Sequence, residues 1–154
     1  MVNNTMPDNQ QSKELLTYFG LAVYYSQALE QLLANLVMTM KLSKEDVYSE
    51  ERFTENFRKR LSSSLGQLVK EIQQHFSFSD VEMNELIGIW KQRNFIVHDY
   101  FKVNIHDSFT ADGRTAMIKE LKDFSTRTEK LYSRLQRYNE QLLNDVEPTD
   151  NMEE

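Results

Sequence analysis

The sequence predicts an all-α fold, an up-and-down bundle of four to five helices. Three observations support this prediction. The chain of 154 residues contains only four glycines and two prolines, and both prolines, Pro7 and Pro148, lie near its ends. Apolar residues recur every three or four positions over long stretches, which is the period of an amphipathic helix. Strand-like alternation does not persist anywhere, so the pattern indicates helices joined by short connections.

Two long amphipathic helices are expected to bracket the domain. In the first, the spacing of the stripe alternates between four and three residues, and a serine fills one place: Leu15, Phe19, Ala22, Ser26, Leu29, Leu33, Leu36 and Met40. A similar spacing recurs late in the chain at Met117, Leu121, Phe124, Thr128, Leu131, Leu135, Tyr138 and Leu142. A period held over so many turns predicts one buried stripe on each helix.

Between these helices, the sequence predicts a helix that starts near Ser49 and continues through Leu61. The serines at 62–64 mark a break, after which residues 65–69 resume the helical pattern. One helix with a weak point and two short helices both fit this pattern.

A further helix is predicted to begin at Ser79. A serine followed three residues later by a glutamate, here Glu82, is a capping box that favours a helix start. We expect this helix to run to about Phe101. Residues 104–113 then form the connection to the last helix, and Asp112-Gly113 is its turn signal.

The expected domain covers residues 12–144. Residues 1–11 are polar and residues 145–154 are acidic, so both are expected to be disordered tails. An extended coiled coil is the competing architecture, but the serine-rich break and the loop at 104–113 would interrupt it. No apolar run approaches the ~20 residues that cross a bilayer, and the N-terminus is not signal-like. We therefore expect a soluble, cytoplasmic protein without a membrane partner.

Composition narrows the possible chemistry. The chain has no cysteine, which excludes disulfides, thiolate catalysis and cysteine-based zinc sites. Its net charge of -6 argues against a broad nucleic-acid footprint, because non-specific affinity comes mainly from Lys and Arg that neutralise phosphates. Any role in nucleic-acid binding must therefore be local.

The stretch KQRNFIVHDYF, residues 91–101, concentrates polar groups in the second half of the helix that starts at Ser79. At about 100° per residue, Arg93, Asn94, His98 and Tyr100 all fall within one arc, and Arg93 and His98 flank the buried stripe. Asn94 precedes His98 by one turn, close enough to orient its ring. This placement suits a lined cleft.

A structural explanation of the same residues stays open. Histidine and basic residues near a helix C-terminus interact favourably with its dipole and free carbonyls, by ~0.3–1 kcal/mol. Glu30 interrupts the buried side of the first helix, and it either pairs with Arg93 across the bundle or reaches solvent.

The run RNFIVHDY, from Arg93 to Tyr100, resembles the signature of the HEPN superfamily, in which an arginine, a polar residue, a few apolar residues and a histidine lie late in a helix of a small α-bundle. The spacing of Arg, four residues, His, one residue and Tyr is similar in particular to the toxin half of HEPN–nucleotidyltransferase toxin–antitoxin pairs. The likeness in architecture extends over about residues 12–144.

The resemblance implies a metal-independent RNA endonuclease, a toxin or defence effector, that needs no cofactor and acts as a homodimer. His98 would be a general base or acid at the ribose 2′-hydroxyl and the leaving oxygen, and an ordinary pKa of ~6.5 suits both roles. Arg93 would stabilise the charge of a phosphorane-like transition state. Asn94 would orient His98 or contact phosphate.

The resemblance also implies partners. In the toxin–antitoxin pairs, the partner attaches AMP to the tyrosine that matches Tyr100, so Tyr100 is a candidate modification site as well as a candidate core-edge aromatic. A cognate antitoxin or nucleotidyltransferase would be the protein partner and RNA the substrate. Basic residues that could extend the cleft are Lys91, Lys102 and Arg114.

A second alternative is a non-catalytic HEPN-like dimerisation or regulatory module, because many HEPN domains serve that role. A metal site is not expected. His98 and His106 are eight residues apart, which does not match the spacing of metal ligands on a helix, and the chain has no cysteine, so neither His75 nor His106 is expected to be a metal ligand.

Overall fold

The computed structural model describes residues 5–44, 54–55, 65–75 and 78–146. Within these ranges the chain forms helices and no strand, which confirms the all-α prediction. The elements are α1 (Gln10–Lys44), α3 (Leu65–His75), α4 (Asp80–His98), α5 (Tyr100–Val103), the 3-10 helix η1 (Asp107–Phe109) and α6 (Ala111–Val146). Among the described residues, no helix combines the length and the apolar character that a membrane span requires.

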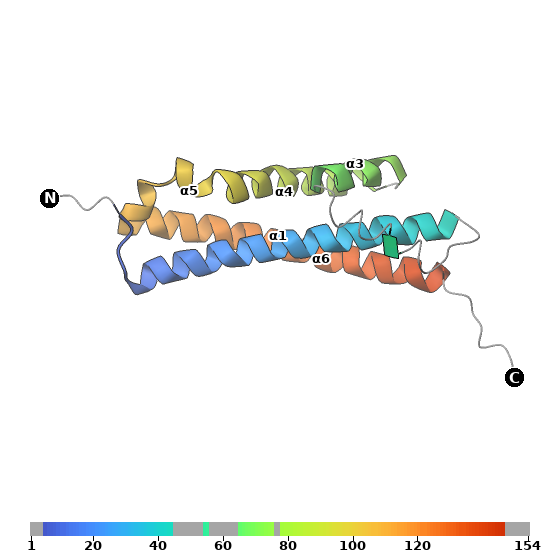
Figure 1. The fold of residues 1–154 in the computed structure, drawn as a ribbon, viewed down its shortest axis with the longest axis horizontal. Helices are drawn as coiled ribbons and strands as arrows, with labels where there is room; N and C mark the ends of the chain where they lie inside the picture. Colours follow the sequence, from blue (N-terminus) through green and yellow to red (C-terminus); the bar gives the residue numbers. More distant parts are fainter. Residues whose placement is uncertain (1–4, 45–53, 56–64, 76–77, 147–154) are drawn as a thin grey trace, which may run out of the picture.

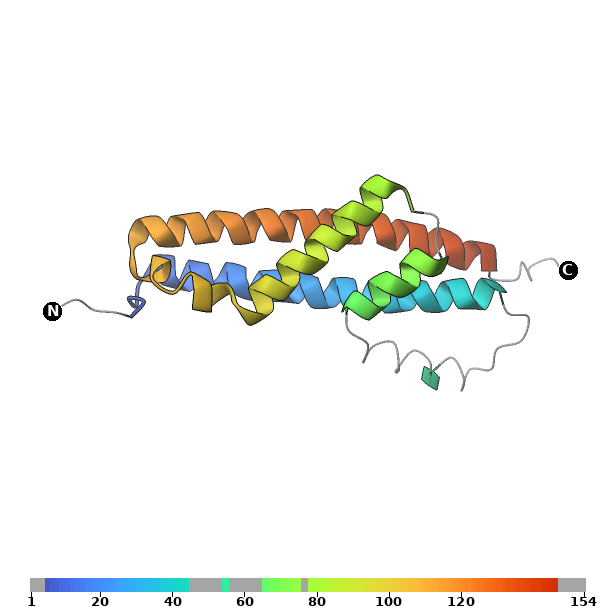
Figure 2. The same ribbon diagram turned by 90° about the horizontal axis from the view of Figure 1, so that it is seen from above.

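The helices α1 and α6 lie side by side and run in the same direction (Figures 1 and 2). The contacts between them show this direction. Gln11 donates a hydrogen bond to Thr115 near the start of both helices, and Glu14 lies 4.0 Å from Lys122 further along both. The two long helices therefore form a parallel pair.

The shorter helices α3, α4 and α5 cover one face of this pair (Figure 1). α4 crosses the pair obliquely and runs against α6, because Gln92 accepts a hydrogen bond from Arg127 while the earlier Glu85 accepts one from the later Arg134 (Figure 2). The helix α4 thus runs in the opposite direction to both α1 and α6. Their arrangement is a two-helix layer with a covering layer.

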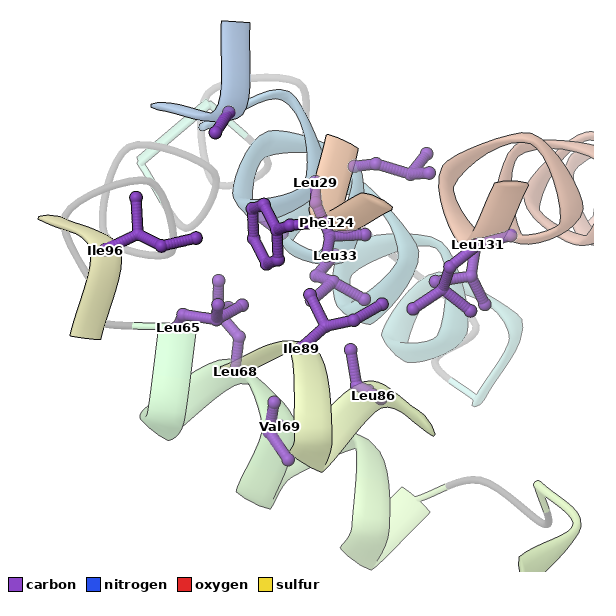
Figure 3. Packing of buried hydrophobic residues seen from close by; sticks show 14 of the residues in the cluster. Leu29, Leu33, Leu65, Leu68, Val69, Leu86, Ile89, Ile96, Phe124 and Leu131 are labelled. Carbon is purple, nitrogen blue, oxygen red and sulfur yellow. The ribbon is translucent and has the colours of Figure 1, made fainter. Parts of the chain in front are cut away.

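The core lies between these two layers (Figure 3). The stripe predicted for α1 is buried from Leu15 to Met40, except that Phe19 is partly buried. The stripe predicted for α6 is buried from Met117 to Leu135. The middle of both predicted stripes is therefore confirmed.

At the end of α6 the buried position shifts by one residue, because Tyr138 is 36% exposed and Asn139 is buried instead. A repeat that alternates three and four residues drifts relative to the 3.6-residue helix, and this drift accumulates along a long helix.

The start of α4 confirms the predicted cap. Ser79 has extended backbone angles, and its hydroxyl oxygen accepts a hydrogen bond from the Glu82 amide at 3.2 Å. This bond satisfies one of the amides that a helix start leaves without a partner.

The end of α4 differs from the prediction, because the helix ends at His98 and does not continue to Phe101. The backbone of Asp99 leaves the helical conformation, with φ −131° and ψ −7°, and the chain resumes as α5. This break turns the Tyr100 ring into the core, where it lies 6.4 Å from the ring of Phe19 and 5.7 Å from that of Phe95. Burial of the ring offsets the interrupted helix.

Asp112-Gly113 was predicted to be a turn, and this is wrong, because both residues lie in the first turn of α6. Thr110 caps the helix, since its hydroxyl oxygen accepts a hydrogen bond from the Gly113 amide at 3.0 Å. A Cβ atom at Gly113 would lie 2.1 Å from the carbonyl oxygen of Asp107. Glycine is needed here for the close approach of η1.

The predicted middle helix from Ser49 to Leu61, and the break at 62–64, lie largely outside the described residues. The resumed pattern at 65–69 is helical and forms the start of α3, as predicted. α1 begins at Gln10, before the expected boundary at Ser12, and α6 continues to Val146, past the expected boundary at Asn144.

Candidate functional site

Arg93 lies on the side of α4 that faces α1, where it meets Glu30. Its Nη2 atom is 2.7 Å from Oε1 of Glu30, and this ion pair was one of the two alternatives that the sequence left open. The Nη1 atom donates a hydrogen bond to Oδ1 of Asn94 at 3.1 Å. The side chains of Arg93 and Glu30 are only 20% and 23% exposed, so the pair is largely removed from water.

The Arg93–Glu30 pair is close but incompletely hydrogen-bonded. Oε1 of Glu30 and Nε of Arg93 are both buried without an aligned hydrogen-bond partner among the described residues. The two side chains are therefore as close as in an ion pair, but they do not form the two parallel N–H···O hydrogen bonds of a bidentate pair.

Burial dominates the electrostatics of Glu30. Desolvation raises the pKa of its carboxyl above the ordinary value of 4.5, and the charge and hydrogen bonding of Arg93 oppose this effect without cancelling it. A raised pKa in the folded state means that the protein holds this proton more tightly than the unfolded chain does. The stabilisation is complete at low pH and is lost as the pH rises through the raised pKa.

We therefore expect the stability of the wild type relative to Glu30→Gln, which imitates the protonated carboxyl, to fall as the pH rises from about 4 to 7. Urea unfolding of both proteins at several pH values measures this difference. A difference that grows in favour of the wild type as the pH rises would show that the attraction of Arg93 outweighs the burial of Glu30.

His98 is the last residue of α4, and its side chain is exposed. No hydrogen bond or ion pair of its ring is found within the described ranges. The ring is thus accessible to a molecule that approaches from solvent.

The spacing of Asn94 and His98 suggested that Asn94 orients the histidine ring, but no hydrogen bond between the two is found among the described residues. The side-chain oxygen of Asn94 is engaged by Arg93 instead. The structure accordingly brings Arg93, Asn94 and Glu30 together, and it places His98 at the end of the same helix without a direct contact to them in the described part of the chain.

Tyr100 lies in the core with only 1% of its surface exposed. Its hydroxyl donates a hydrogen bond to the carbonyl oxygen of Met117 at 3.2 Å. Burial, together with the carboxylates of Glu120 and Asp107, raises the pKa of this hydroxyl well above its usual range. A transferase cannot reach the hydroxyl in this conformation, so the geometry favours the alternative of a core aromatic.

The three basic residues expected to extend the cleft separate into two kinds. Lys91 and Lys102 are exposed on α4 and α5. Arg114 is buried at the start of α6, where Nε donates to Oε1 of Gln11 at 2.7 Å and Nη1 donates to the Ser108 carbonyl at 3.0 Å. Arg114 therefore joins the ends of three elements and does not extend the cleft.

The sequence reasoning missed an apolar hollow beside α5. Its volume is about 350 Å³, and its lining includes Leu16, Phe101, Ile105 and Phe109. Ile105, which is 40% exposed, is one of the residues that line this hollow. No periodic signal could have revealed it, because its residues come from the segment before α1, from α1, from α5 and from the region around η1.

Within the described ranges, no three His, Asp or Glu side chains lie close enough together to hold a metal ion. Comparisons with protein-family models, with curated proteins and with solved structures found no match to this chain.

Proposed function

We propose that this protein is a metal-independent RNA endonuclease of the HEPN type that acts as a homodimer. The observation that supports this proposal best is the exposed His98, which has no partner among the described residues and lies at the end of the helix that also carries Arg93. An unpaired imidazole open to solvent is available for proton transfer near neutral pH.

The reaction needs a base and an acid. The base removes the proton of the ribose 2′-hydroxyl, the 2′-oxygen attacks the adjacent phosphorus, and the bond from phosphorus to the 5′-oxygen breaks as that oxygen is protonated. The products are a 2′,3′-cyclic phosphate and a 5′-hydroxyl. A guanidinium near the phosphate stabilises the charge on its oxygens.

One protomer offers one motif histidine for these two proton transfers. A two-fold dimer in which the ends of both α4 helices meet would supply two, one as base and one as acid. It would also bring two copies of Arg93 together, and each would act as a positive group for the phosphate only when Glu30 does not neutralise it.

The test is cleavage of RNA by the purified protein in excess EDTA, with the product ends analysed. Cyclic phosphate ends without added metal are the expected result. Protein that remains dimeric by sedimentation but leaves RNA intact over a long incubation would contradict the nuclease and favour an interaction module.

The second candidate is a non-catalytic HEPN-like dimerisation or regulatory module, and the Arg93–Glu30 pair favours it. An arginine that is four-fifths buried and already neutralised behaves like a structural residue. On this alternative, replacing both members, in Glu30→Gln/Arg93→Gln, should dissociate the dimer or lower the melting temperature. Single replacement of Arg93 is less informative, since it leaves the Glu30 carboxylate buried without a cation.

A cognate antitoxin or nucleotidyltransferase remains part of the first proposal. AMP transfer to Tyr100 would require the segment that follows His98 to open, because the hydroxyl is buried against Met117.

A further inference from the structure

We propose that Glu30 is an internal competitor for the RNA phosphate at Arg93. The inference rests on the proposed function. In the free protein, the Glu30 carboxylate occupies the guanidinium that would bind the phosphate, and RNA binding displaces it. Glu30 would then set the affinity of the site for RNA by acting through Arg93.

A carboxylate and a phosphodiester are chemically similar partners for the guanidinium of Arg93. Both groups present anionic oxygens to the guanidinium fork, and both prefer the same N–H groups. Oε1 of Glu30 lies 2.7 Å from Nη2 of Arg93. A phosphate that needs this group has to exclude the carboxylate from it.

Asn94 can keep the guanidinium of Arg93 in place while the phosphate replaces Glu30. Asn94 lies on the same helix as Arg93 and accepts from Nη1, whereas Glu30 comes from α1. Loss of the Glu30 contact therefore leaves Arg93 tethered within α4. About a fifth of the Arg93 side chain is exposed to solvent.

The contact between Glu30 and Arg93 is less well aligned than another ion pair of α4. The comparable pair between α4 and α6 joins Arg134 and Glu85 at 2.6 Å and has hydrogen-bond alignment. Oε1 of Glu30 and Nε of Arg93 have no aligned partner within the described ranges, although both are buried. Because Glu30 gives up solvation without full hydrogen bonding in return, a ligand needs less interaction energy to displace it.

The experiment measures binding separately from cleavage. A short fluorescent 2′-O-methyl oligoribonucleotide cannot be cut by attack of a 2′-hydroxyl, and its anisotropy reports binding to the full chain. Glu30→Gln should bind it about tenfold more tightly than the wild type, the change expected from one charge-assisted hydrogen bond made available.

The matched control is Glu85→Gln. It makes the same change in net charge and also removes the carboxylate of an ion pair between α4 and a long helix. Its affinity should equal that of the wild type. The gain of Glu30→Gln should disappear in Glu30→Gln/Arg93→Gln, which ties the effect to the guanidinium and not to charge in general.

Weaker binding by Glu30→Gln would overturn the inference, because it would mean that Glu30 positions Arg93 for the phosphate. Equal gains in Glu30→Gln and Glu85→Gln, or no binding by any variant, would overturn it as well. A gain that depends on Arg93, found together with intact RNA in the cleavage assay, would keep the inference for an RNA-binding protein and reject only the nuclease.

Discussion

Replacement of His98 by alanine should reduce RNA cleavage by about 100- to 10,000-fold, which is the usual contribution of a positioned general acid or base. In a homodimer the change removes both proton-transfer groups at once. Folding should be unaffected, because the ring is exposed and no partner for it is found among the described residues. Cleavage rates in EDTA and thermal melting of the same preparations measure the two effects.

His106 provides the control for this substitution. It is also exposed, and its only described ring contact is with Phe109 at 5.8 Å. His106→Ala should therefore cleave RNA at the wild-type rate. Equal losses in the two variants, or unchanged cleavage by His98→Ala, would show that His98 is not the catalytic group.

Replacement of Gly113 by alanine should produce the largest loss of stability from a single methyl group. The new Cβ would lie 2.1 Å from the carbonyl oxygen of Asp107 and 2.6 Å from its carbonyl carbon. These are backbone atoms, so the clash cannot be relieved by a side-chain rotation. We expect the free energy of unfolding to fall by about 3 kcal/mol and the melting temperature to fall by on the order of 10 °C.

Gly20→Ala is the matched control for Gly113→Ala. A Cβ at Gly20 meets no atom within 4 Å, and the residue lies inside α1. Alanine has the higher helix propensity, so this variant should be more stable than the wild type by about 1 kcal/mol. Thermal melts followed by circular dichroism compare the two. An unchanged Gly113→Ala would contradict the close approach of η1 to α6.

The helices were predictable because their signals are local. The period of apolar residues defined α1 and α6, and the spacing of Ser79 and Glu82 defined the start of α4. Each signal depends on the geometry of one helix and needs no knowledge of its neighbours.

The errors have a tertiary origin. The helix break at Asp99 is stabilised by the burial of Tyr100 against aromatic rings from another helix. Gly113 is required by the approach of η1, and the sequence shows only a dipeptide that is common in turns. Neither cause is visible in the residues that flank these positions.

The candidate site was predictable in part. The facing position of Glu30 on the first helix suggested the pair with Arg93, and the structure forms it. The prediction that Asn94 orients His98 was based on their spacing alone. In the structure, the amide oxygen of Asn94 accepts a hydrogen bond from the charged guanidinium of Arg93 instead. Catalysis and dimerisation stay predictions, since both depend on a second molecule.

The parallel direction of α1 and α6 has a consequence for how the chain folds. Two parallel helices cannot be joined by a tight turn, and the contacts between Gln11 and the start of α6 span about a hundred residues of chain. The entropy of closing so long a loop must be overcome before those contacts form. Although the described residues form helices and no strand, these long-range contacts should make the protein fold more slowly than a bundle of sequential antiparallel hairpins.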